Sequence, residues 1–195
     1  MAEDFLRQSP LAHLHLAARA VAEPGEAGVT LRERPFGAMA TLRGNAGDPA
    51  FVAAVEGVVG VAPPREPLTV ARAGERAILW LGPDEWLVTG LPAADLAAAL
   101  TDLHAAATET GESMTVIELA GPRARDVLAK GCALDLHGSA FPAGRVVRTL
   151  VAKSGVILHA TGEPFDVYVH RSFADYLWRW LEDAGLEYGV AVLAP

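Results

Sequence analysis

The chain has 195 residues, a formal net charge of −8, and 51% hydrophobic residues. This length suits one compact domain or two small lobes that share a core. The acidic balance argues against nucleic acid and anionic membranes as partners, because both carry negative charge. Cys132 is the single cysteine, which excludes an internal disulfide framework and any multi-cysteine metal site. The N-terminus opens acidic and lacks a signal-peptide core, and the nearest apolar segment, 11–22, carries polar residues and is far short of a membrane span. We therefore expect a cytoplasmic protein.

Residues 1–27 are interpreted as an N-terminal arm. The arm carries large apolar side chains at no helical or strand period, namely Phe5, Leu6, Leu11, Leu14 and Leu16. A solvated tail rarely carries so many large apolar groups. Two interpretations therefore stay open, a frayed tail or an arm that lies on a partner chain.

Residues 28–110 are predicted to form the first lobe, built around a hairpin. Two apolar runs, 78–81 and 86–88, flank the turn residues Gly82-Pro83-Asp84, as in a pair of buried strands. A helix is predicted to begin where Asp48 precedes Pro49, because these residues suit the N-cap and the first helical turn, and to end at Gly57 and Gly60. Strands are predicted at 29–34, 36–42 and 68–71, and a second helix is predicted from Pro92 to before Gly111, with Leu96, Leu100 and Leu103 on its inner face.

Residues 111–195 repeat this order as a second lobe. A strand at 115–119, a helix after Gly121-Pro122 and a strand at 145–151 lead to a hairpin at 156–169. A last helix is predicted to start with a capping box and to bury Phe173, Leu177, Trp180, Leu181 and Ala184. Trp178 lies off that inner face, so it either packs on a flanking loop or anchors a partner, since tryptophan is enriched at interface hot spots.

The two lobes keep a constant spacing. Gly74 and Gly155, Gly82 and Gly162, and Asp95 and Asp175 are the matched positions, at separations of 80 or 81 residues. The sequence therefore predicts an α+β fold of two pseudo-repeated strand–helix–strands–helix lobes packed together.

Candidate chemistry is sparse. Cys132, Asp135 and His137 lie close in sequence, but Cys132 falls on the buried face of its predicted helix, so a nucleophile there is not favoured. His13 and His15 would share one side of a strand, yet nothing nearby completes a metal site. No phosphate-binding glycine loop is present. No catalytic, cofactor-binding or metal-binding residue is therefore predicted, and Asp84-Glu85 beside Trp86 is the one polar pair set into a strongly apolar element.

Four sequence motifs together resemble the gamma subunit family of heterotetrameric sarcosine oxidases. They are S-P-L at 9–11, L-G-P-D-E-W-L-V at 81–88, D-L-H at 135–137 and R-S-F-A-D-Y-L-W-R-W-L at 171–181. The resemblance covers nearly the whole chain. It implies the fold of the folate-binding aminomethyltransferase of glycine cleavage, which agrees with the doubled unit.

The resemblance also implies a function. In that family the complex oxidises sarcosine to glycine and passes the methyl carbon to tetrahydrofolate or releases it as formaldehyde. FAD, FMN and NAD belong to partner subunits, so no cofactor is expected in this chain. The implied role is that of a non-catalytic structural subunit beside alpha, beta and delta subunits. The alternative is a stand-alone folate-binding or one-carbon-transfer protein of the same fold.

An interface with other chains is expected at the arm and at the outer face of the last helix. The expected contact residues are Phe5, Leu6, Leu11, Leu14, Leu16 and Trp178. In a homo-oligomer of the isolated chain they would contact another copy, and in the complex they would contact the alpha subunit. The reason is that contiguous apolar surface usually marks a binding site.

Overall fold

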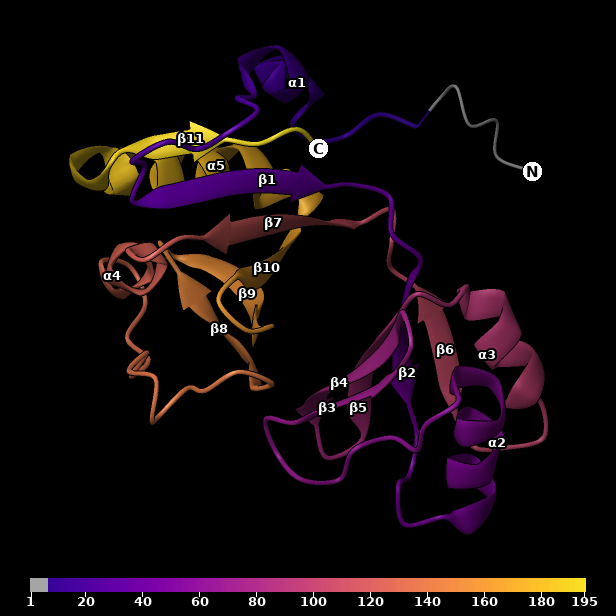
Figure 1. The fold of residues 1–195 in the computed structure, drawn as a ribbon. Helices are drawn as coiled ribbons and strands as arrows, with labels where there is room; N and C mark the ends of the chain where they lie inside the picture. Colours follow the sequence, from indigo (N-terminus) through magenta and orange to yellow (C-terminus); the bar gives the residue numbers. More distant parts are fainter. Residues whose placement is uncertain (1–6) are drawn as a thin grey trace. The chain divides into compact units, whose positions relative to one another are not determined.

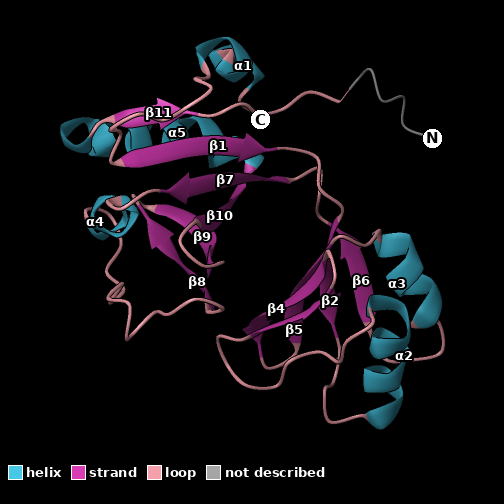
Figure 2. Cartoon of the chain, viewed as in Figure 1, coloured by secondary structure: helices cyan, strands magenta, loops and turns pink. Residues whose placement is uncertain are grey.

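The computed structural model describes residues 7–195 and divides them into two compact units. We call residues 37–112 with 144–147 the central unit. We call residues 7–36, 113–143 and 148–195 the terminal unit. Each unit contains one β-sheet and its own helices (Figures 1 and 2).

The central unit is a five-stranded antiparallel sheet with two helices on one face (Figure 1). Its strand order is β3-β4-β5-β2-β6. Its elements are β2 (Met39–Arg43), α2 (Pro49–Val59), β3 (Val70–Ala73), β4 (Arg76–Gly82), β5 (Glu85–Thr89), α3 (Ala93–Ala99) and β6 (Ala106–Glu109).

The hairpin predicted at residues 78–88 is confirmed as β4 and β5. Ile78 pairs with Val88 and Trp80 with Trp86, and the register shifts just before the Pro83-Asp84 turn. The Trp86 ring is fully buried, with its centroid 5.8 Å from that of Phe51 on α2. Its indole Nε1–H donates to a backbone carbonyl 2.8 Å away, so the large ring is buried without an unpaired polar atom.

Helix α2 also has its predicted ends. The Asp48 carboxylate accepts a hydrogen bond from the backbone N–H of Ala50, Pro49 occupies the first turn, and Gly60 closes the helix with φ of 89°. A left-handed residue at this position is a common helix ending and favours glycine.

The second helix of the central unit is shorter than predicted. Leu96 and Leu100 are buried as expected, but α3 ends at Ala99 and residues 106–109 form strand β6 on the edge beside β2. Alanine-rich sequence favours helix by intrinsic propensity. Pairing with β2 overrides that propensity here, which the local pattern does not reveal.

The terminal unit is a mixed six-stranded sheet of order β11-β1-β7-β10-β9-β8. Strand β1 is antiparallel to β7 and parallel to β11, and α5 packs against β7 and β10. The elements of this sheet and its helices are η2 (Ala12–Leu14), α1 (Leu16–Arg19), β1 (Val29–Arg34), β7 (Met114–Ala120), α4 (Ala124–Ala129), β8 (Val146–Val151), β9 (Ser154–Ala160), β10 (Phe165–His170), α5 (Arg171–Gly185), η3 (Leu186–Tyr188) and β11 (Val190–Val192).

The lobe boundaries predicted from sequence require a correction at the N-terminal side. The predicted break between residues 110 and 111 lies close to the observed one at 112–113. Strand β1, assigned to the first lobe 28–110, instead pairs with β7 and belongs to the terminal unit. The arm 1–27 also joins this unit over its described part, where the Val21 N–H donates to the Val192 carbonyl at 3.0 Å. Sheet membership follows long-range pairing, so proximity in sequence misassigned this strand.

Two local predictions in the second half are wrong. The turn between β8 and β9 consists of Ala152 and Lys153, both in the left-handed region, and Gly155 lies inside β9, so it does not match the turn residue Gly74. The predicted capping box at Ser172 and Asp175 is absent, because α5 begins after His170 without a side-chain cap.

The buried face of α5 is rotated relative to the prediction. Leu177 and Leu181 are buried as expected, whereas Phe173 is 49% exposed and Trp178 is fully buried. The buried residues of this helix are Ala174, Leu177, Trp178, Leu181 and Gly185. The helix therefore packs on a second element besides the sheet.

That second element is the N-terminal arm. His13 Nε2 lies 2.6 Å from Asp175 Oδ1, and Arg19 pairs with Glu182 about two helical turns further along. Residues 175, 178 and 182 share one side of a helix. The arm therefore runs along the side of α5 that carries Trp178. Figure 1 shows α1 above α5 and β11.

Candidate functional site

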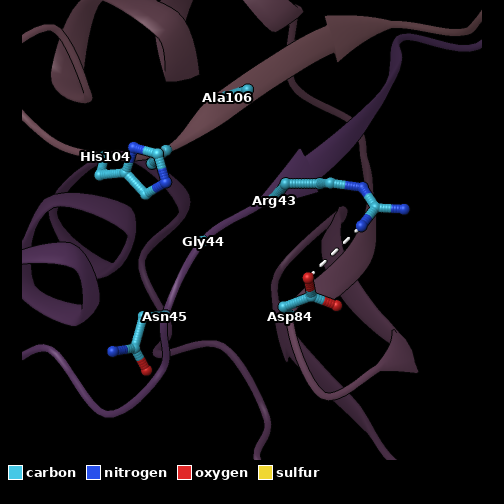
Figure 3. Close-up of a pocket in the computed structure, with 7 residues that line it drawn as sticks. Arg43, Gly44, Asn45, Asp84, His104 and Ala106 are labelled. Atoms are coloured by element: carbon cyan, nitrogen blue, oxygen red, sulfur yellow. Dashed lines mark hydrogen bonds and ion pairs between the residues drawn. The ribbon is translucent and has the colours of Figure 1, made fainter.

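The central unit contains a cavity of about 400 Å³ around the end of β2 and the β4–β5 turn (Figure 3). Arg43 lies between two carboxylates, with its Nη1 3.4 Å from Asp84 and its Nη2 2.7 Å from Glu85. Asn45 and His104 lie on the opposite side of Arg43 in the cavity wall. Thus Asp84 of the polar pair noted in the sequence lines a cavity. The pairing of β2 with β5 supplies the arginine that neutralises both carboxylates.

Backbone geometry fixes the shape of this cavity. The Gly44 N–H donates to the Asp84 carbonyl at 3.2 Å, and Asn45 Oδ1 accepts from the N–H of Gly47 at 2.8 Å. A side chain at Gly44 would overlap the ring of Phe51. Glycine is therefore required where the backbone passes over the buried ring.

The cavity residues do not form a catalytic arrangement. They are Arg43, Gly44, Asn45, Asp84, His104, Ala105 and Ala106, which include no serine, threonine, cysteine or lysine nucleophile. The Arg43 side chain and the Asp84 side chain are both more than half exposed, so their ion pair is screened by solvent. This geometry supports a surface contact better than a reaction.

The cysteine and histidine residues singled out in the sequence do not come together. Cys132 is buried, with its Sγ 4.0 Å from the Thr149 hydroxyl. Asp135 accepts from the backbone N–H of His137, whose Nδ1 lies 2.8 Å from the Ser139 hydroxyl. The histidine is thus engaged with its own loop and does not act as a base for the cysteine.

The two arm histidines also serve separate roles. His13 pairs with Asp175, while His15 lines a different cavity, and neither lies on a strand as predicted. Over residues 7–195, no group of three or more His, Cys, Asp or Glu side chains is placed to hold a metal ion.

A polar row crosses the sheet of the terminal unit and was not predicted. Arg32, Glu118, Asp166 and His159 are successive partners in the register of β1, β7, β10 and β9. Arg34 forms an ion pair with Asp166 and lies 3.6 Å from Glu118. Burial alone would lower the pKa of Arg34, but these two carboxylates outweigh it and the pKa is raised.

Together with Arg34, the polar row places two arginines beside two carboxylates, so it acts as an internal network that fixes strand register. The available sequence signal was a single carboxylate, Glu118 or Asp166, inside each of two largely apolar stretches. Only the pairing register brings those positions together.

The expected partner-interface residues lie in different environments. Leu11, Leu16 and Trp178 are at most 4% exposed and are already covered within the chain, so the placement of Trp178 on the outer face of its helix is wrong. Leu14 is half-buried. Phe5 and Leu6 lie outside the described residues. The side of α5 with Trp178 packs along the chain's own arm, so the two segments expected to meet a partner lie together instead.

Comparison with known structures first identifies the fold. The aminomethyltransferase T of the glycine cleavage system from Bartonella henselae superposes with a TM-score of 0.71 over 96% of this chain and 59% of that chain. The identity is 15%, so this likeness shows a shared α+β fold alone.

Comparison of sequences identifies the family. The family model described as "Sarcosine oxidase, gamma subunit family" matches residues 43–187. Sarcosine oxidase subunit gamma from Arthrobacter sp. is 38% identical over 200 residues, covering 97% of this chain and 95% of the relative. The chain therefore belongs to the sarcosine oxidase gamma subunit family, as its motifs predicted.

A solved relative shows how closely the fold is kept. A chain of the heterotetrameric sarcosine oxidase from Corynebacterium sp. U-96, determined in complex with pyrrole 2-carboxylate, is 34% identical and superposes with a TM-score of 0.84. The match covers 95% of this chain and 98% of that one. None of the helices within residues 7–195 combines the length and apolar character that crossing a membrane requires.

Proposed function

We propose that this chain is the gamma subunit of a heterotetrameric sarcosine oxidase and that its role is structural. The observation that carries the proposal is the near full-length match, at 34% identity and a TM-score of 0.84, to a chain of such a heterotetramer. The subunit would assemble with alpha, beta and delta subunits in the cytoplasm and would support flavin-dependent oxidation of sarcosine to glycine. When isolated, the chain would associate with a second copy of itself through the surface that contacts the partner subunits in the complex.

The side chains of the cavity support a non-catalytic role. The central-unit cavity offers an arginine that is already neutralised by two carboxylates and no nucleophile. We therefore assign the flavin and nicotinamide chemistry, with FAD, FMN and NAD, to the partner subunits.

We also infer that the two units are copies of one ancestral α+β unit. The element order β2-α2-β3-β4-β5-α3-β6 in the central unit matches β7-α4-β8-β9-β10-α5-β11 in the terminal unit. The sheet orders also correspond when β1 is treated as a strand inserted between β7 and β11. This inference is supported by topology and does not depend on the glycine spacing.

A second candidate function is binding of a folate by the chain alone. It is favoured by the likeness to an aminomethyltransferase over 96% of this chain, although the match spans only 59% of that enzyme. We rank this candidate second because the identity is 15% and the fold hosts more than one role.

Co-expression with the three partner subunits tests the proposal. We expect the chain to co-purify with them in one particle of constant stoichiometry, and we expect omission of the chain to lower the yield or stability of the flavin-containing complex. Co-purification of an active complex with and without the chain, with equal yield and thermal stability, would contradict the structural role. Saturable binding of tetrahydrofolate to the isolated chain in calorimetry would instead favour the second candidate.

A further inference from the structure

A second cavity, of about 360 Å³, lies in the terminal unit between the N-terminal segment and the end of β1. Most of its lining residues are apolar, and Glu33 contributes a carboxylate to the lining. The lining residues used below are Ser9, Leu11, Leu16, Glu33 and Pro35.

Glu33, which lines this cavity, is 2% exposed. The Ser9 hydroxyl lies 2.6 Å from both carboxylate oxygens, and the Thr115 hydroxyl donates to Oε1 at 3.0 Å. Ser9 is itself held in place, because its Oγ accepts from the backbone N–H of Leu11 at 2.9 Å. The two hydroxyls therefore hold the Glu33 carboxylate in a fixed orientation beside the cavity.

The Glu33 carboxylate has no cationic partner among the residues that the structure describes. Over the described residues, no Arg, Lys or His side chain lies within ion-pair distance of Glu33, whereas Arg34 next to it pairs with Asp166. Side chains alternate between the two faces of a strand, so the arginines at 32 and 34 point away from Glu33. A buried carboxylate without a counter-charge is costly, and a bound cation would remove that cost.

We propose that this cavity binds a small alkylammonium ion. The ammonium N–H groups would bond the Glu33 carboxylate, and the alkyl group would lie against Leu11, Leu16 and Pro35. A hard metal ion fits less well, because such ions require several oxygen ligands and Glu33 is the one carboxylate side chain of the lining. An amino acid fits less well too, because the lining contains no arginine or lysine to hold its carboxylate. The inference does not rest on the proposed function.

Titration of the purified full chain with isobutylammonium chloride tests this site, with chemical shifts of the arm amides as the readout. Isobutanol has nearly the same shape without the charge, and potassium chloride controls for ionic strength. We expect isobutylammonium to saturate one site and isobutanol to bind at least tenfold more weakly. Glu33→Gln should weaken ammonium binding at least tenfold, while Glu163→Gln, at an exposed carboxylate of the same unit, should leave it unchanged.

Three results would overturn the proposal: no saturable ammonium binding to the wild-type chain, equal binding of isobutanol, or equal ammonium binding by Glu33→Gln. The comparison of ammonium with alcohol uses the wild-type chain, so it decides the question even if Glu33→Gln fails to fold. Weaker folding of Glu33→Gln together with no ammonium binding by the wild type would instead assign Glu33 to holding Ser9 in place.

Discussion

Trp178 shows how a side chain that lies off the sheet-facing side of a helix can still belong to the core. It has no exposed surface, and its Nε1 makes no hydrogen bond in the described structure. It lies three residues after Asp175 and four before Glu182, which both pair with the arm. The arm therefore completes the burial of this ring, and Trp178 stabilises the terminal unit.

We expect Trp178→Ala to destabilise the chain by about 3–5 kcal/mol, because it removes a fully buried aromatic side chain and leaves a cavity. Trp178→Phe should cost less, since it keeps most of the ring volume and removes a donor without a partner. Tyr176→Ala, on the exposed side of the same helix at 48% exposure, should change stability by no more than about 0.5 kcal/mol. Urea denaturation of the three variants measures these effects. A Trp178→Ala variant with nearly unchanged stability would contradict the assignment of Trp178 to the core.

The arm and α5 form a contact at the scale of whole elements. The His13–Asp175 pair, the Arg19–Glu182 pair and the bond from Arg171 to the Gln8 carbonyl at 2.9 Å join segments about 160 residues apart. The hydrogen bond with His13 and then those with Arg179 lower the pKa of Asp175 below its usual value of about 3.8. The contact is therefore partly electrostatic and depends on pH.

A lowered carboxylate pKa adds stability that is present above the unfolded pKa. The contribution is lost as the pH falls through the lower pKa of the folded chain. We expect Asp175→Asn to lose about 0.2–1 kcal/mol near neutral pH, the range of exposed ion pairs. The variant should then show a shallower fall in stability than the wild type below about pH 4.

Urea midpoints measured from pH 7 to pH 2.5 check this, with the exposed Asp183→Asn as the matched control. Parallel pH profiles for the wild type and Asp175→Asn would show that the pair contributes nothing to the docking of the arm.

Elements with local signals were predictable from the sequence. The α2 helix was predicted from Asp48, Pro49 and Gly60, and the β4–β5 hairpin from two apolar runs around one turn. Short edge strands such as β6 were not, because alanine-rich sequence does not distinguish a strand from a helix. The place of β1 in the other sheet depends on pairing with residues about 90 positions away, which no local pattern encodes.

The candidate sites divide in the same way. Asp84-Glu85 was recognisable as a polar pair in an apolar element, but its partner Arg43 is set by the β2–β5 register. Glu33 read as an ordinary strand carboxylate. Glu33 is buried beside the arm, and the apolar residues of the arm show no period in the sequence. The burial of Glu33 therefore could not be predicted from the sequence.

At the scale of the whole molecule, the two units differ in how the chain builds them. The sheet and core of the central unit come almost entirely from the continuous segment 37–112. The terminal unit needs 7–36, because β1 lies between β7 and β11 in its sheet. From that segment come four buried apolar side chains, Leu11, Leu16, Val29 and Leu31.

We therefore expect a fragment of residues 113–195 to remain unfolded by itself. Each of the four side chains contributes about 1.5–3 kcal/mol when buried, so their loss approaches the 5–15 kcal/mol that a whole domain typically has. Without β1, strand β11 also loses its parallel neighbour. A fragment of residues 37–112 should fold cooperatively, since its helices and strands pack on one another.

Circular dichroism and urea titration of the two fragments measure this difference. Adding a peptide of residues 7–36 to fragment 113–195 should restore a cooperative transition, because β1 and the buried arm residues return together. A peptide with Leu16 and Leu31 both changed to Ser should not, since it keeps the backbone pairing of β1 but loses two fully covered side chains. If fragment 113–195 folds cooperatively alone, β1 and the arm add little to the terminal unit, and the burial of Trp178 would have to be independent of them.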